Sequence, residues 1–229
     1  MKKLTLIISI FALSLVNLAR AEVDPFEEFN RGIFTFNESL DNTVFEPTAR
    51  AYRDHMPEFV QDRVHDFFSN LGDVSTLANQ ILQFKAEDSV TTFSRVVINT
   101  TVGLAGLFDV ASDMGMEQTD EDFGQTLAVW GVGDGPYIML PILGPSTLRD
   151  TAGFYVDSTA NTSFNAHLDG GEQTAATLTN ALDIRTELLP VTDLLDSADD
   201  PYIAMRSSYL QKRKNDIYDG NVPVSDDDF

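Results

Sequence analysis

Cysteine is absent from the 229 residues of this sequence. Without thiols the chain has no disulfides, no thiolate metal sites, no cysteine nucleophile and no sulfur for a thioether-linked lipid anchor. Basic residues are also scarce: 15 Lys and Arg stand against 36 Asp and Glu, which gives a formal net charge of -21. Because such a surface repels phosphate backbones, nucleic acid is not expected as a partner.

Apolar runs of membrane-spanning length are lacking after the first 21 residues. The most apolar later stretches are residues 96–111, which polar side chains interrupt, and residues 137–143, which are too short to cross a bilayer. The negative charge also argues against electrostatic attraction to anionic lipid. Any membrane contact would therefore have to come from the burial of apolar surface.

The first 21 residues have the pattern of a leader. Lys2 and Lys3 precede an apolar stretch at residues 4–18, and Ala19 and Ala21 supply small side chains at the two positions that a signal peptidase reads. An uncleaved anchor is the alternative, but a spanning helix needs about 20 apolar residues. We expect residues 1–21 to be a cleaved signal peptide that directs export to the periplasm.

The rest of the chain has the composition of one globular domain. Hydrophobic residues make up 43% of the sequence, which is enough to build a core. The sequence shows no internal repeat and no clear linker. We expect one domain over residues 22–218, followed by an acidic flexible tail at residues 219–229.

Helical periodicity dominates the first half of this domain. Asp24 and Pro25 predict the cap and first position of a helix, whose apolar stripe recurs at steps of three and four: Phe26, Phe29, Ile33, Phe36, Leu40 and Val44. Pro57 predicts the start of a second helix and Gly72 its end. A third helix is expected from Asp73 and a fourth after Asp88.

Glycine is concentrated in the middle of the chain. Between residues 103 and 144 glycine occurs at positions 103, 106, 115, 124, 131, 133, 135 and 144, so an irregular or hairpin-like apolar segment is expected there. Helix signals return over residues 172–189, stopped by Pro190, and again after Asp200 and Pro201. The fold class predicted is mostly α.

Patterns that would support catalysis are weak. The three histidines are His55, His65 and His167, and none stands one helical turn from another, as a paired zinc site on a helix requires. Ser146 lies outside a G-x-S-x-G motif and is expected to cap a turn. Acidic pairs are too numerous for any two to be singled out as general acid and base.

The loop Gly131–Pro136 could be taken for a phosphate cradle. That chemistry needs a helix directly after the loop and backbone N–H groups that face the anion. Asp134 puts a negative charge in the loop, Pro136 removes a donor, and the residues that follow do not start a helix. A structural turn is the favoured interpretation, and no cofactor or metal is expected.

Five ordered blocks of sequence resemble the MlaA/VacJ family of Gram-negative outer membranes. They are Asp24–Arg31, Val97–Ala111, Asp122–Leu127, the group Trp130–Tyr137 with Leu140, Pro141 and Leu148–Asp150, and finally Asp200–Tyr202 with Arg206. The resemblance extends over residues 24–218.

The resemblance implies a fold and a function. The family's proteins are ring-like and multi-helical, and they sit in the inner leaflet of the outer membrane. An amphipathic channel through the ring lets misplaced phospholipids leave the outer leaflet for a soluble periplasmic lipid-carrier protein, with trimeric outer-membrane porins as partners. The expected function is thus retrograde phospholipid transport that preserves lipid asymmetry, with no covalent chemistry.

Three groups of residues are candidates for this role. The apolar, irregular segments that match the family blocks are expected to contact lipid in the channel: Val97, Val102, Leu104, Leu107, Phe108, Tyr137, Ile138, Leu140 and Pro141. A hinge or gate is expected at Gly131, Gly133, Gly135 and Pro136. Phe29, Ile33, Phe36 and Leu40 are expected to form an amphipathic core or rim.

One departure from the family concerns the membrane anchor. Members are commonly lipoproteins acylated on an N-terminal cysteine, and this sequence has none. Retention at the membrane would then depend on apolar surface or on a porin. A soluble periplasmic lipid-binding module is an alternative function, and a lipid hydrolase is a further one for which no nucleophile and base are found.

Overall fold

The computed structural model describes residues 24–164, 169–195 and 197–223. The predicted signal peptide, residues 1–21, lies outside the described residues, as do His167 and residues 224–229 of the predicted acidic tail.

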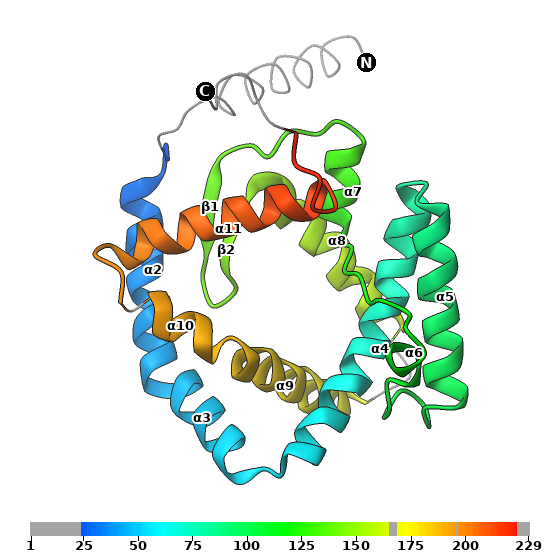
Figure 1. Cartoon of the computed structure of the whole chain (residues 1–229). Helices are drawn as coiled ribbons and strands as arrows, with labels where there is room; N and C mark the ends of the chain where they lie inside the picture. The colour runs from blue at the N-terminus through cyan, green and yellow to red at the C-terminus, as the bar shows by residue number, and fades with distance from the viewer. Residues whose placement is uncertain (1–23, 165–168, 196, 224–229) are drawn as a thin grey trace.

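Helices account for most of the fold and follow a closed course around a central opening (Figure 1). In chain order the elements are α2 Glu27–Leu40, the π-helix η1 Asp41–Phe45, α3 Glu46–His55, α4 Glu58–Leu82, α5 Ala86–Thr101, α6 Val110–Asp113, α7 Phe123–Val129, β1 Tyr137–Leu140, β2 Gly144–Thr147, α8 Leu148–Phe164, α9 Gly170–Glu187, α10 Leu189–Leu195 and α11 Pro201–Ile217. The mostly α fold and the hairpin in its glycine-rich middle are confirmed.

The first helix starts later than predicted. It begins at Glu27 after Phe26, so Asp24 is not its cap, although the Asp24 carboxylate accepts a hydrogen bond from the Phe26 N–H. Asp24 is buried, and its carboxylate also accepts hydrogen bonds from Asn30 and from the Tyr202 hydroxyl. These tertiary bonds draw Asp24 toward α11. Beyond Leu40 the helix continues through η1 into α3, past Val44, the last residue of the predicted stripe.

A single helix, α4, replaces the two that were predicted on either side of Gly72. The helix passes through Gly72, where an added Cβ would meet open space, so no close contact requires a glycine or a turn there. An interior glycine costs a helix only about 1 kcal/mol relative to alanine. The helical periodicity of apolar and polar residues continues on both sides of Gly72. The packing of α4 along α5 offsets the cost of the glycine.

The buried faces of α4 and α5 are polar. Asp73, Thr76 and Asn79 of α4 are buried, as are Arg95 and Asn99 of α5. Arg95 and Asp73 form an ion pair of 3.2 Å in which each side chain is 1% exposed. Burial raises the pKa of Asp73, while the paired Arg95 opposes that shift. Each partner thus keeps the other from being a lone buried charge.

Large apolar side chains are predominantly exposed and not packed into a core. Six hydrophobic residues are buried among the described residues, against 18 polar or charged ones. The exposed apolar side chains of α2, α4 and α5 include Phe29, Phe36, Phe59, Phe67, Val90, Phe93 and Val97. These helices therefore leave much of their apolar surface exposed, unlike those of an ordinary water-soluble bundle.

A small apolar cluster fixes the hairpin against α2 and α11. Strands β1 and β2 are antiparallel, with Tyr137 opposite Thr147. Tyr137 and Met139 are buried against Tyr202, and Ile33 and Met205 pack around them. Ser146, predicted to cap a turn, lies in β2 instead; the Thr147 hydroxyl accepts the Asp150 N–H at the start of α8. That cap belongs to a helix that the sequence did not predict.

The last helices start at well-formed caps. Asp169 and Glu172 make a capping box at α9, which ends at Glu187, and Pro190 lies in α10. Asp200 caps α11 by accepting the Ile203 N–H, as predicted. Over the described ranges, no helix combines the length and hydropathy needed to cross a membrane.

Candidate functional site

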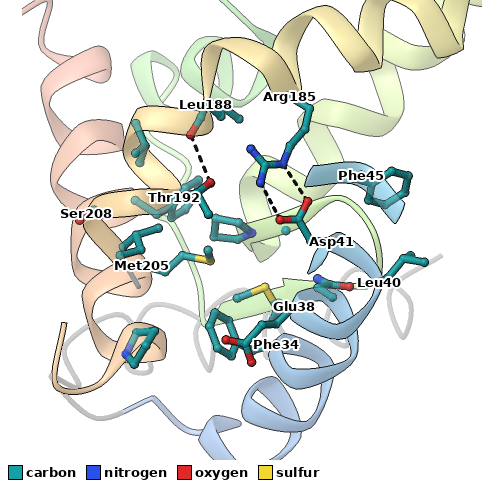
Figure 2. Close-up of a pocket in the computed structure, with 18 of the residues that line it drawn as sticks. Phe34, Glu38, Leu40, Asp41, Phe45, Arg185, Leu188, Thr192, Met205 and Ser208 are labelled. Carbon is teal, nitrogen blue, oxygen red and sulfur yellow. Dashed lines mark hydrogen bonds and ion pairs between the residues drawn. The ribbon is translucent and has the colours of Figure 1, made fainter. Parts of the chain in front are cut away.

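A cavity of about 390 Å³ lies inside the closed course of helices. Its wall comes from four parts of the chain: α2 with η1, the tip of the hairpin, α9 with α10, and α11 (Figure 2). The lining is Phe34, Asn37, Glu38, Leu40, Asp41, Asn42, Phe45, Met139, Ile142, Gly144, Pro145, Arg185, Leu188, Val191, Thr192, Leu195, Pro201, Met205, Ser208, Tyr209 and Lys212. Most of these side chains are apolar, and a few charged groups interrupt them.

Helix α2 supplies one wall and holds the hairpin in place. Phe34, Asn37, Glu38 and Asp41 recur at helical spacing, so they share the face that lines the cavity. The Asn37 amide donates to the Leu140 carbonyl at 2.9 Å. The Asn37 side-chain oxygen accepts the Ile142 N–H at 2.7 Å. The hairpin tip is thereby fixed beside the cavity.

An ion pair joins the two sides of the cavity. Arg185 of α9 donates through Nε and Nη2 to the two carboxylate oxygens of Asp41 in η1, each at 2.7 Å (Figure 2). The hydrogen bonds from Arg185 to Asp41 raise the pKa of the guanidinium, so this cation stays charged. A two-bonded Arg–carboxylate contact has a fixed geometry, and here it links residues that are 144 positions apart.

Helix α11 forms the opposite wall. Met205, Ser208 and Lys212 lie at helical spacing on the face that lines the cavity. Lys212 also pairs with Asp216 at 2.7 Å, and its side chain is largely exposed. Because an exposed pair of this kind contributes little free energy, Lys212 is held only weakly.

A polar cluster beside the cavity fixes α11 to α7 and α8. Arg213 pairs with Asp122 and with Asp150, and the Tyr209 hydroxyl donates to Asp150 at 2.8 Å. Burial alone would raise the pKa of Asp150, but Arg213 and Arg149 lower it. Every charge in the cluster has a partner. The cluster therefore positions α11 against α7 and α8.

The predicted lipid-contact residues of the first segment lie away from the cavity. Val97 is on α5, and Val102, Leu104, Leu107 and Phe108 are on the turns that follow it. None of them lines the cavity. Val102 and Leu104 are more than 60% exposed, and Phe108 packs with Phe59 and Arg63. Contact of this segment with lipid stays a prediction.

The hairpin residues lie closer to the cavity. Tyr137 is buried in the apolar cluster, Ile138 and Leu140 are half-buried, and Pro141 is exposed. These four do not line the cavity, whereas their neighbours Met139 and Ile142 do.

The predicted gate and rim residues lie in different parts of the structure. Gly131, Gly133, Gly135 and Pro136 lie between α7 and β1, outside the lining. On α2 the stripe divides: Phe29 and Phe36 are 61% and 51% exposed, Ile33 packs on the apolar cluster, and Leu40 lines the cavity.

The lining contributed by α9, α10 and α11 was not predicted. Met205, Ser208 and Lys212 share no chemical character, so their periodicity is invisible on a hydropathy scale. Their spacing alone could have placed these three residues on one face of α11, a helix that the sequence did predict. The partner of Arg185 could not be identified from sequence.

The side chains considered for catalysis have structural contacts. The Ser146 hydroxyl lies 2.9 Å from that of Thr151 and also donates to the Thr147 carbonyl. His65 contacts Asp183 and Glu187 at the joint between α4 and α9. His55 contacts the Ala51 carbonyl. These contacts bring no histidine to Ser146.

Comparison with known proteins identifies similar chains. The family model described as MlaA lipoprotein matches residues 22–216. The intermembrane phospholipid transport system lipoprotein MlaA of Escherichia coli is 33% identical over 195 residues, which covers 82% of this chain and 76% of that protein. The protein of that description in Haemophilus influenzae is 31% identical over 205 residues, covering 88% and 82%.

A solved structure is similar over its whole length. It is described as the structural basis for maintenance of bacterial outer membrane lipid asymmetry. It has a TM-score of 0.74 and 32% identity to this chain, and the match covers 87% of this chain and 100% of the other.

Proposed function

This chain belongs to the MlaA family, whose described role is intermembrane phospholipid transport and outer-membrane lipid asymmetry, and we propose that its cavity is the path for the lipid. In this proposal phospholipids misplaced in the outer leaflet enter the cavity and pass toward the periplasm. The observation that carries it is one cavity with a mainly apolar wall interrupted by a few charged groups. Such a wall accepts both parts of a phospholipid.

The outward apolar surface supports a position in the membrane. Exposed Phe29 and Phe36 on α2, with Val90 and Phe93 on α5, would lose contact with water in a lipid leaflet. Burying a large apolar side chain contributes about 1.5 to 3 kcal/mol. We propose that this surface retains the protein at the periplasmic face of the outer membrane.

The family resemblance and the sequence also suggest partners and processing. We propose a trimeric outer-membrane porin and a soluble periplasmic lipid-carrier protein as partners, which the family resemblance implies. We also propose cleavage after Ala21, a working domain over residues 22–218, and a flexible acidic tail from residue 219. The reaction is transport with no covalent step.

Obstruction of the cavity tests the proposal. Leu188 lines the cavity, whereas Leu194 is exposed on α10 outside it. The variants are expressed in cells that lack the native gene. With Leu188→Trp, phospholipid should remain in the outer leaflet and the cells should stay sensitive to detergent. With Leu194→Trp, outer-leaflet phospholipid and detergent sensitivity should both return to normal. Both proteins should reach the membrane in equal amounts. Equal restoration by the two variants would show that lipid does not use this cavity.

A further inference from the structure

The charged groups of the cavity wall are unequally paired. Four charged side chains line it: Glu38, Asp41, Arg185 and Lys212. Asp41 pairs with Arg185, and Lys212 pairs with Asp216. The Glu38 carboxylate has no hydrogen bond or ion pair with any residue that the structure describes. One negative charge is therefore left without a counter-charge in a largely apolar wall.

Arg185, one of the two cations in the cavity wall, already pairs with Asp41. Arg185 directs Nε and Nη2 at Asp41, so the guanidinium edge that would neutralise an acid is occupied. The third nitrogen, Nη1, lies on the far side from Asp41 and is buried without a partner. In Figure 2 Asp41 is turned toward Arg185, whereas the carboxylate of Glu38 is turned away from that pair.

An uncompensated carboxylate in an apolar cavity selects its ligand by charge. A carboxylate near apolar surface gains most from a cationic hydrogen-bond donor. An anionic lipid headgroup is repelled by Glu38 and by the net charge of -21. A zwitterionic headgroup that ends in a primary ammonium offers the matching donor.

We propose that Glu38 binds the ammonium group of a zwitterionic aminophospholipid and that the cavity thereby favours this lipid class over anionic phospholipids. The inference rests on the proposed function, because it names the lipid class that uses the same cavity. It assigns a specificity-determining role to one exposed side chain of α2.

Headgroup analysis of bound lipid tests the inference. The purified full chain is equilibrated with vesicles of equimolar phosphatidylethanolamine and phosphatidylglycerol and re-isolated, and the extracted lipids are quantified by mass spectrometry. The test variant is Glu38→Gln. Glu28→Gln is the matched control, because Glu28 is exposed on the same helix, outside the cavity lining, and its loss changes the net charge equally.

The expected result is an enrichment of phosphatidylethanolamine by the native chain and by Glu28→Gln. In Glu38→Gln that enrichment should fall about three- to tenfold, the scale of one lost charge contact. Glu38→Lys should reverse the preference toward phosphatidylglycerol. Total lipid bound per chain should be equal in all four proteins, which shows that folding and the cavity are intact.

Two failures are distinguishable. If lipid binds with no headgroup preference, or if Glu38→Gln keeps the native ratio, the role of Glu38 is wrong while lipid binding itself stands. If none of the proteins binds lipid, the proposed function itself is contradicted.

Discussion

Asn30 and Asn37 lie seven residues apart on α2, and both side-chain amides pair with the same stretch of backbone in the hairpin. Asn30 donates to the Tyr137 carbonyl and accepts the Met139 N–H at 2.9 Å. Asn37 makes the equivalent two bonds, to the Leu140 carbonyl and the Ile142 N–H. Two asparagines of a helix thus occupy the position of a neighbouring strand.

Loss of these amides should weaken the hairpin. Asn30 is buried and also donates to Asp24, so Asn30→Ala should lower the free energy of unfolding by about 2 to 3 kcal/mol; Asn37→Ala, whose site is half-exposed, should lower it by about 1 kcal/mol. Urea unfolding measures both. Asn215→Ala on α11 is the control, since Asn215 is exposed. Equal stability of all three variants would contradict this account of the hairpin.

The carboxylate of Asp109 makes stability depend on pH. Burial opposes ionisation, but hydrogen bonds from Ser112, Asn99 and Arg95 lower the pKa of Asp109 to about 2. An ordinary aspartate has a pKa of about 3.9, so the stabilisation is present above about pH 5 and is lost as the pH falls toward 2.

Comparison with an uncharged variant isolates this contribution. The native chain should exceed Asp109→Asn by about 1 to 2 kcal/mol at pH 6, and the difference should shrink toward pH 2. Thermal unfolding at a series of pH values measures it. Asp120→Asn, at an exposed position, should track the native chain throughout. A difference for Asp109→Asn that is independent of pH would rule out ionisation as its cause.

Some elements could be predicted because their signals are local. The Asp200 cap of α11 and the periodic stripe of α5 depend on neighbouring residues, and both were found. Helix α8 was missed because its cap, Thr147, lies inside a strand. Gly72 was taken for a helix end although packing of α4 on α5 carries the helix through it.

The direction of the apolar faces could not be predicted. Periodicity defines a face but does not say whether that face meets a core or a membrane, and the stripe at Phe29 and Phe36 proved to be exposed. The buried partner of Arg95 is Asp73, 22 residues away, and the partner of Arg185 is Asp41. Both pairs are tertiary contacts between residues that no local pattern connects.

The proposed hinge before the hairpin can be tested without misfolding the chain. A Cβ at Gly133 would meet open space, whereas Gly135 has a φ of +68° and lies against Leu148. Gly133→Val should therefore leave the unfolding temperature unchanged. If residues 131–136 act as a hinge, the variant should still slow the removal of phospholipid from the outer leaflet. Native rates of removal would end the hinge proposal.

Retention at the membrane should depend on the outward apolar surface. With its own leader, the native chain should stay in the outer-membrane fraction through washes with high salt and then carbonate. Phe29→Ser combined with Phe36→Ser removes two exposed aromatic side chains and should release part of the protein into the carbonate wash. Release of the native chain by salt alone would mean that the apolar surface does not hold it.

The most direct test of the lipid path uses the absence of cysteine. Ser208 lines the cavity, and Ser207, also exposed on α11, does not. Each is replaced by cysteine in cells without the native gene, and the single thiol is modified with a bulky methanethiosulfonate and later freed with a reductant. Modification of Ser208→Cys should raise outer-leaflet phospholipid and reduction should restore it, while Ser207→Cys should not respond. Fully modified Ser208→Cys with unchanged outer-leaflet phospholipid would contradict transport through this cavity.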